Sequence, residues 1–263
     1  MVRAPTSSRR RLSRRALKLA LGAGCALLVL QPGDARADDT RPVRAGGSPY
    51  RLKWTYDSAL VALGAAGTMT AAIGHPKPAC YPTCEPPTNM LGIDDASVGN
   101  YSPQALGLAN VVVFGLVLAP MVINAADSRF DGWLEDSFVS LQAVLLSSAI
   151  TQVMKSAVSR PAPLVYNPIA AQSHLDSPDA FRSFISGHSS TAFAAATSYS
   201  VTFWKRHPTS PWRFVVLGVS HTLAASVSML KVRAGYHYAT DVAAGALVGA
   251  AMGLFVPVLH SDW

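Results

Sequence analysis

Charged residues are scarce in this chain. Lys, Arg, Asp and Glu make up 14% of its 263 residues, and half of the residues are apolar, whereas a soluble domain typically has about 25% charged residues. This shortage argues against an ordinary soluble surface. Because several apolar runs approach the length that crosses a bilayer, the sequence favours an integral membrane protein; a soluble helical protein with a large core is the alternative.

The body of the chain also lacks a net positive charge. The whole chain carries +7, but residues 1–37 hold eight basic residues and one acidic residue, and the rest holds 14 of each sign. A nucleic-acid-binding domain needs a basic stripe on its folded surface. The charge distribution therefore excludes nucleic acid as a partner.

Cysteine is nearly absent. Cys25 lies near the N-terminus, and Cys80 and Cys84 lie in a proline-rich loop. Two cysteines cannot supply the four ligands of a structural zinc site, so we predict no metal. In an oxidising compartment the pair predicts a disulfide bond, with two free thiols as the alternative.

The first 37 residues have the pattern of a bacterial export signal. A basic stretch runs to Lys18, an apolar stretch follows at Leu19–Leu30, and Ala-Arg-Ala at 35–37 fits a cleavage site. The alternative is an uncleaved cytoplasmic arm and anchor. We expect an export signal at 1–37, a polar linker at 38–57 and a helical membrane domain at 58–263.

Six apolar segments predict an all-α fold, a bundle of about six membrane helices. They are rich in Ala, Gly, Leu and Val, with scattered Ser and Thr, which suits helices that pack closely in a membrane. The segments are Ser58–Gly74, Ala105–Ala125, Phe138–Met154, Ser189–Phe203, Trp212–Leu230 and Asp241–Leu259.

The connections between these segments predict their orientation. Lys205, Arg206 and Arg213 flank the fourth connection, and the positive-inside rule places that connection in the cytoplasm. The loop at 155–188 and the turn near His237 then face the periplasm across the bacterial inner membrane. One conflict stays open: if the leader is cleaved, a first segment that spans the membrane would invert everything downstream.

A first cluster of charges, at 155–163, ends the third segment. Lys155 sits on its last turn, Arg160 follows, and Pro161 and Pro163 stop the helix. A guanidinium fork and an ammonium group at one surface suit a phosphate. The alternative is a pair of cations that snorkel from a helix end.

A second cluster, at 182–193, opens the fourth segment. Ser186 is suited to capping the helix, whose free first-turn amides make an anion site. Gly187 allows the backbone to approach a ligand closely, and His188 is placed there as a proton donor. The alternative is a capping turn with an incidental histidine.

The third cluster pairs a histidine with a carboxylate. His237 and Asp241 are four residues apart and share a face if the turn is helical. Asp241 is then able to accept from one ring nitrogen and leave the other free to attack. Lys231 and Arg233 add two cations. A structural histidine is the alternative.

The three clusters, in this order, resemble the signature of the phosphatidic acid phosphatase type 2 (PAP2) superfamily. That signature reads lysine, six residues, Arg-Pro; then Pro-Ser-Gly-His; then Ser-Arg, five residues, His, three residues, Asp. The resemblance covers about Lys155 to Gly245 and implies a PAP2/haloperoxidase-like fold. It also implies roles. His237 would attack phosphorus and form a phosphohistidine, Asp241 would orient it, and His188 would protonate the leaving oxygen and then activate water. The phosphoryl oxygens would be held by Lys155, Arg160, Ser186, Gly187, Lys231 and Arg233.

The chain departs from this signature at several positions. Ala162 stands where the family has arginine, and we expect Arg160, two residues earlier, to take over part of the phosphate-binding role of that arginine. Ala162→Arg should then leave activity unchanged or raise it, and should partly rescue Arg160→Ala. Ile185 replaces the proline of the second motif, and Lys231 replaces the arginine of the third, with Arg233 as its expected compensation.

The resemblance implies a membrane phosphatase that needs no cofactor and acts on a lipid phosphate or diphosphate. Phosphatidic acid, a polyprenyl diphosphate and a lipid A phosphate all fit. Two alternatives remain: a non-catalytic or structural membrane protein that binds lipid head groups, and a vanadate-dependent haloperoxidase-like enzyme. The haloperoxidases of this family are soluble, which six apolar segments argue against.

Overall fold

The computed structural model describes residues 47–69, 81, 84–86, 88 and 90–261. The predicted export signal, part of the linker, Cys80 and the end of the first apolar segment lie outside these residues. Cys84 is described, and it is disulfide-bonded.

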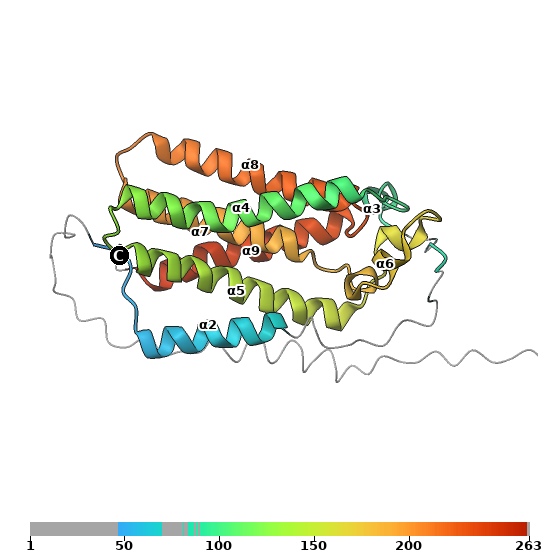
Figure 1. Cartoon of the computed structure of the whole chain (residues 1–263), viewed down its shortest axis with the longest axis horizontal. Helices are drawn as coiled ribbons and strands as arrows, with labels where there is room; N and C mark the ends of the chain where they lie inside the picture. The colour runs from blue at the N-terminus through green and yellow to red at the C-terminus, as the bar shows by residue number, and fades with distance from the viewer. Residues whose placement is uncertain (1–46, 70–80, 82–83, 87, 89, 262–263) are drawn as a thin grey trace, which may run out of the picture. The chain divides into compact units, whose positions relative to one another are not determined.

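The described chain is helical, and the prediction of an all-α bundle is confirmed (Figure 1). Each of the six predicted segments corresponds to one long helix, and short helical turns lie in the connections. An isolated bridge joins Tyr50 to Ser261. The elements are α2 (Trp54–Met69), α3 (Gly92–Asp95), α4 (Pro103–Asp127), α5 (Trp133–Val158), η2 (Pro163–Tyr166), α6 (Gln172–Leu175), η3 (Pro178–Phe181), α7 (Gly187–Arg206), α8 (Trp212–Arg233) and α9 (Ala239–Leu259).

Four described helices are long and apolar enough to cross a membrane. They are α4, α5, α8 and α9. α2 has 16 residues, which is short for a bilayer core of about 30 Å, and it packs against α5. The chain is therefore a helical membrane protein in which two of the six expected segments, α2 and α7, differ from ordinary spans.

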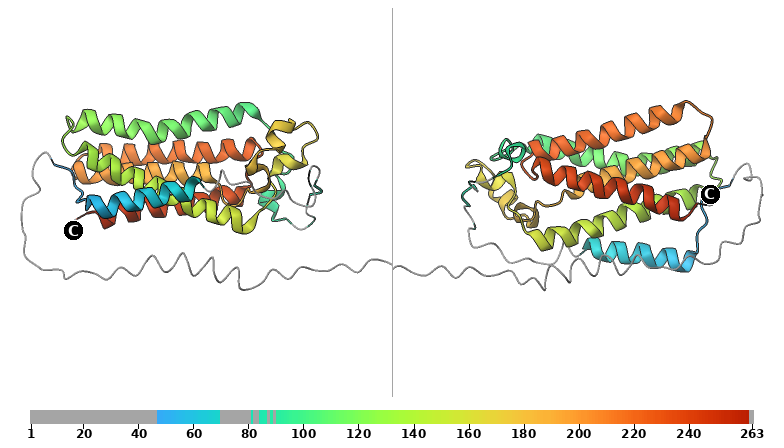
Figure 2. Two further views of the ribbon diagram at one scale, coloured as in Figure 1. Left: turned by 60° about the horizontal axis from the view of Figure 1, so that its bottom comes forward. Right: turned by 180° about the vertical axis from the view of Figure 1, so that it is seen from behind.

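α7 is too polar to face lipid, and its position in the bundle explains this composition. It packs against α4, α5, α8 and α9 (Figures 1 and 2). Its hydroxyls bond to its neighbours: Ser189 accepts from Ser228 at 2.8 Å, and Ser200 pairs with Ser220 at 3.1 Å. Because other helices surround α7, serine and threonine find partners there and no lipid-facing apolar surface is needed.

Close packing of α9 on α7 depends on glycines spaced four apart. These are Gly245, Gly249 and Gly253. A Cβ atom on Gly249 would lie 2.2 Å from the Ser190 carbonyl oxygen, so this close approach of two backbones requires glycine. The contact brings the N-terminal ends of α7 and α9 together, where two of the charged clusters lie.

Gly249→Val is expected to destabilise the protein, because the added side chain meets backbone that cannot rotate away. Overpacking of this kind costs about 1–3 kcal/mol or more. Thermal unfolding in detergent, followed by circular dichroism, measures the effect. The matched control is Gly218→Val on α8, where a Cβ meets no atom within 4 Å. Equal unfolding temperatures for the two variants would contradict this account of the α7–α9 contact.

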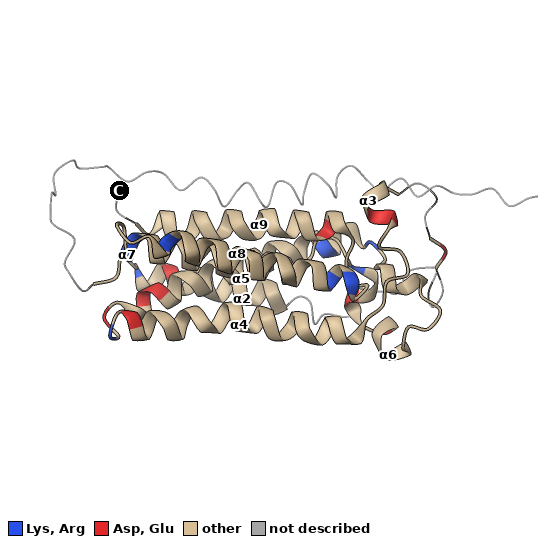
Figure 3. Ribbon diagram, turned by 90° about the horizontal axis from the view of Figure 1, so that it is seen from above, with Lys and Arg blue, Asp and Glu red and all other residues tan. Residues whose placement is uncertain are grey.

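Charges gather toward the two ends of the bundle, and the stretch between them is almost free of charge (Figure 3). At one end Arg206 pairs with the buried Asp136 at 2.5 Å, beside the connection between α7 and α8. The opposite end holds the N-termini of α7 and α9 and the C-terminus of α5. The three predicted clusters therefore share one end, away from the connection expected in the cytoplasm.

Candidate active site

The site at this end is built from segments that are far apart in sequence. The last turn of α5 carries Lys155, the start of α7 carries Gly187 and His188, and the turn before α9 carries His237. The Ser186 backbone N–H donates to the Asp241 carbonyl oxygen at 3.0 Å. This bond ties the start of α7 to the first turn of α9.

A tight turn positions His237. α8 ends at Arg233 and Gly235 reverses the chain with a φ of 83°, a conformation that favours glycine. A Cβ there would lie 1.8 Å from the Asn100 carbonyl oxygen, so glycine is required for space as well. Two residues later His237 is 2% exposed.

Ser183 holds the imidazole of His237. The Nδ1–H donates to the Ser183 carbonyl oxygen at 2.7 Å, and because a carbonyl only accepts, this contact leaves Nε2 with a free lone pair. We expected Asp241 to accept this hydrogen bond. Its Oδ2 lies 3.8 Å from the same nitrogen, longer than a hydrogen bond, so Asp241 lies beside His237 and the carbonyl orients it. A backbone carbonyl 54 residues away leaves no signal in the sequence.

Burial lowers the pKa of His237 to about 4; Asp241 opposes this shift, and Lys155 and Lys231 add to it. A pKa of about 4 leaves the ring neutral near pH 7. Neutrality is what a nitrogen nucleophile needs.

Asp241 is fully buried, and its two oxygens have different partners. Oδ2 accepts from the Tyr238 backbone N–H at 2.9 Å, which caps the first turn of α9. Oδ1 accepts from Arg160 at 2.8 Å. The carboxylate therefore joins the turn that carries His237 to the segment after α5.

Arg160 lies between two carboxylates. One terminal nitrogen binds Asp241, the other binds Asp94 Oδ2 at 2.9 Å, and the guanidinium stacks on the Tyr238 ring at 3.7 Å. Asp94 also accepts from the Thr240 N–H at 2.9 Å, so it caps α9. It is 2% exposed and therefore buried from solvent. A direct contact of Arg160 with phosphate stays a prediction.

The position where the family has arginine is packed. Ala162 is fully buried in an apolar cluster with Ala105, Leu164, Ala234 and Tyr236. An arginine side chain there would have to displace this cluster. The burial of Ala162 therefore argues against the expectation that Ala162→Arg keeps full activity, because the backbone turns this position into the core.

His188 is held by a residue that the motifs do not include. Its Nε2 lies 2.7 Å from the Asn110 Oδ1 on α4. Because an amide oxygen accepts, Nε2–H is the donor and Nδ1 is the remaining ring nitrogen. α4 has two asparagines in its apolar run, Asn110 and Asn124, and they were the available signal, since polar groups in membrane helices tend to be functional.

Two buried lysines provide positive charge. Lys155 and Lys231 are each 3% exposed. Lys155 Nζ pairs with Asp179 at 2.7 Å, and Lys231 Nζ lies 4.6 Å from the Tyr236 ring centroid. Arg233, by contrast, is exposed at the end of α8, so the structure does not bring it into this buried group.

The start of α7 has the geometry of an anion site. Ser186 caps the helix by accepting from the Ser189 N–H at 3.3 Å. The next residues, Gly187 and His188, form the first turn, whose N–H groups have no partner within the helix. Among the described residues, no three His, Cys, Asp or Glu side chains come together as metal ligands would.

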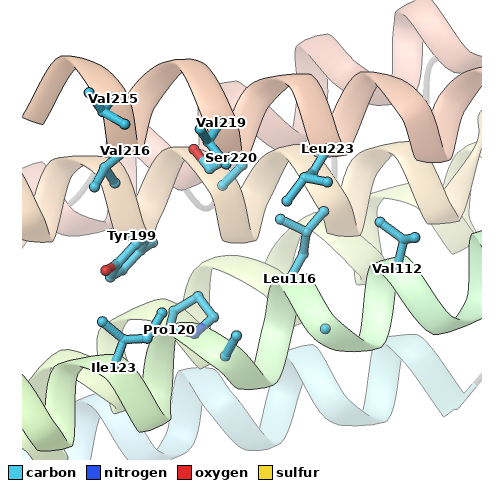
Figure 4. A pocket seen from close by; sticks show the side chains of 13 residues that line it. Val112, Leu116, Pro120, Ile123, Tyr199, Val215, Val216, Val219, Ser220 and Leu223 are labelled. Carbon is cyan, nitrogen blue, oxygen red and sulfur yellow. The ribbon is translucent and has the colours of Figure 1, made fainter. Parts of the chain in front are cut away.

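An apolar cavity of about 480 Å³ lies between α4 and α8, away from these charges (Figure 4). Residues such as Leu116, Ile123, Val219 and Leu223 line it, with Tyr199 from α7. Its lining holds none of the motif residues, so it contributes no group to the chemistry of the cluster.

Comparison with known proteins finds a family that resembles the C-terminal half of the chain. Residues 137–263 match the model of the PAP2 superfamily. No curated protein matches the chain. A solved structure, the crystal structure of the first transmembrane PAP2 type phosphatidylglycerolphosphate phosphatase from Bacillus subtilis, is 20% identical with a TM-score of 0.49, covering 78% of this chain and 92% of that chain. The match at 137–263 contains all three motifs, so this part of the chain is similar to the PAP2 superfamily.

Proposed function

We propose that this chain is a metal-independent lipid phosphatase that hydrolyses a lipid phosphate or diphosphate through a phosphohistidine on His237. Its site faces the periplasm of the bacterial inner membrane, and residues 1–37 act as an export signal. The observation that carries the proposal is the state of His237: a buried, neutral ring whose Nδ1–H is bound to Ser183 and whose Nε2 is free, next to two buried lysines.

In the first step, Nε2 of His237 attacks phosphorus and the bond from phosphorus to the ester oxygen breaks. Burial, with the charge of Lys231, lowers the pKa of His188 to about 3, so the ring takes up its proton from the bound phosphate monoester and gives that proton to the leaving oxygen. The negative charge on the phosphoryl oxygens is balanced by Lys155, Lys231 and the first-turn amides of α7. Such preorganised donors supply most of the stabilisation in reactions of this kind.

In the second step, neutral His188 takes a proton from water, and the water oxygen attacks phosphorus. The bond from phosphorus to Nε2 breaks, which frees phosphate and restores neutral His237. Asn110 fixes the His188 ring for both proton transfers through its bond to Nε2. Asp241 and Arg160 hold the turn that carries His237, and so they act by positioning the nucleophile.

A turnover assay of the protein in detergent tests this function. The panel contains phosphatidic acid, a polyprenyl diphosphate and a lipid A phosphate, each with and without EDTA. We expect release of phosphate from at least one of them, with equal rates in EDTA, since no three His, Cys, Asp or Glu side chains of the described residues converge as metal ligands would. Loss of activity in EDTA that a divalent ion restores would contradict metal independence. Binding of lipid phosphates without turnover would instead support the non-catalytic alternative.

A further inference from the structure

An acidic residue lies where the proposed function needs positive charge. Asp179, in η3, binds Lys155 Nζ at 2.7 Å. The side chain of Lys155 is 4% exposed and that of Asp179 is 46% exposed, so the carboxylate lies toward solvent from the lysine. An anion that approaches Lys155 from solvent therefore meets a negative charge.

The backbone holds this carboxylate in place. Ala162 N–H donates to the Ala180 carbonyl at 2.8 Å, and Ser183 N–H donates to the Arg160 carbonyl at 2.8 Å. These bonds tie the residues that directly follow Asp179 to the segment after α5. The same loop supplies the Ser183 carbonyl to His237, so the carboxylate and the proposed nucleophile belong to one unit.

Charge balance explains why a carboxylate is tolerated there. Lys155 and Lys231 are both buried, and an uncompensated buried ammonium is costly. Partial burial by itself would raise the pKa of Asp179, but the charge and hydrogen bond of Lys155 lower it to about 2. The carboxylate is therefore ionised at neutral pH and neutralises one lysine while no phosphate is bound.

We propose that Asp179 is an internal anion that competes with the phosphoryl group for Lys155, and so weakens the binding of free phosphate, the product. This inference rests on the proposed function for the identity of the ligand. Substrate displaces Asp179 from Lys155 when it binds. After hydrolysis the carboxylate returns to the lysine and favours departure of phosphate. A lipid phosphate, concentrated at the membrane, tolerates this competition better than phosphate in solution.

The test is calorimetric binding of inorganic phosphate to the full chain in detergent, together with its inhibition constant in the turnover assay. Asp179→Asn keeps an oxygen that accepts from Lys155 and removes the charge. We expect it to bind phosphate about tenfold more tightly, the factor that about 1.4 kcal/mol represents. KM for the lipid phosphate should fall as well, while kcat stays the same or falls because product leaves more slowly.

Three further variants sharpen the test. Asp179→Ser removes the charge in a second way and replaces the asparagine variant if that protein does not fold. Asp179→Glu keeps the charge and should keep the weak binding of wild type. Asp176→Asn removes an exposed charge from the same loop, where the carboxylate accepts from Tyr81 and Gln172, and should leave phosphate binding unchanged.

Equal or weaker phosphate binding by both charge-removing variants overturns the inference, as does equal tightening in Asp176→Asn, which would reduce the effect to general electrostatics. A fall in KM for the lipid phosphate without tighter binding of inorganic phosphate also overturns it. The carboxylate would then act on the approach of the lipid head group and not on free phosphate. Binding needs no turnover. A chain that binds phosphate more tightly after Asp179→Asn but hydrolyses no lipid keeps this inference and loses the proposed function.

Discussion

His237→Ala is expected to abolish phosphate release, with a fall in kcat of at least about 10⁴-fold, as loss of a nucleophile produces in other enzymes. The reason is the geometry of the ring. Its Nδ1–H is bound to Ser183 at 2.7 Å, so Nε2 is the nitrogen whose lone pair remains free to attack. Its surroundings keep it neutral, with a pKa of about 4.

The measurement combines turnover with trapping of the intermediate. Wild type, mixed with a ³²P-labelled lipid phosphate and quenched in alkali, should retain label that acid removes, as a phosphohistidine does. His237→Ala should retain none. His221→Ala is the matched control: this histidine lies in the middle of α8 and pairs with Thr197 at 3.1 Å, so its removal should leave turnover near wild type. Wild-type turnover by His237→Ala would refute the mechanism.

Arg160→Ala should lower kcat about a hundredfold or more and also destabilise the fold. The substitution leaves the buried Asp94 and Asp241 without their shared cation, and breaking a buried ion pair on one side costs about 3–5 kcal/mol. The rate falls because Asp241 caps the turn that carries His237. Arg160→Lys should recover part of both losses, because a point charge cannot reach two carboxylates as a fork does.

A control and a double variant separate position from direct contact with phosphate. Arg213 also stacks on an aromatic ring, Trp204, at 4.5 Å, but at the opposite end of the bundle, so Arg213→Ala should keep full activity. Asp94→Asn should recover stability in Arg160→Ala, because it removes one of the two orphaned charges. If stability recovers and kcat does not, Arg160 also contacts phosphate. If Arg160→Ala shows near-normal stability and rate, the ion pairs with Asp94 and Asp241 contribute to neither stability nor catalysis.

The sequence by itself determined the class of fold and singled out the residues of the candidate site. Apolar segments of about bilayer length predicted six helices, and the described part of the chain has six long helices, because hydropathy acts locally along the chain. Motif spacing singled out His237, His188 and Lys155, and the structure brings them to one end of the bundle. The sequence did not separate α7 from the lipid-facing helices, since a segment of small residues packs equally well in a membrane and in a bundle core.

Only the tertiary structure decided the partners of these residues. The carbonyl of Ser183, the amide of Asn110 and the carboxylates of Asp94 and Asp179 each meet their partner across at least 24 residues of sequence. A backbone carbonyl has no residue-specific signature, and a single acid in a loop has the same composition whether it faces water or a lysine. The physical reason is that burial and pairing are set by the docking of α5, α7 and α9. That docking turns Ala162 into the core, Arg160 toward two carboxylates, and Asp179 onto the lysine that a phosphate would need.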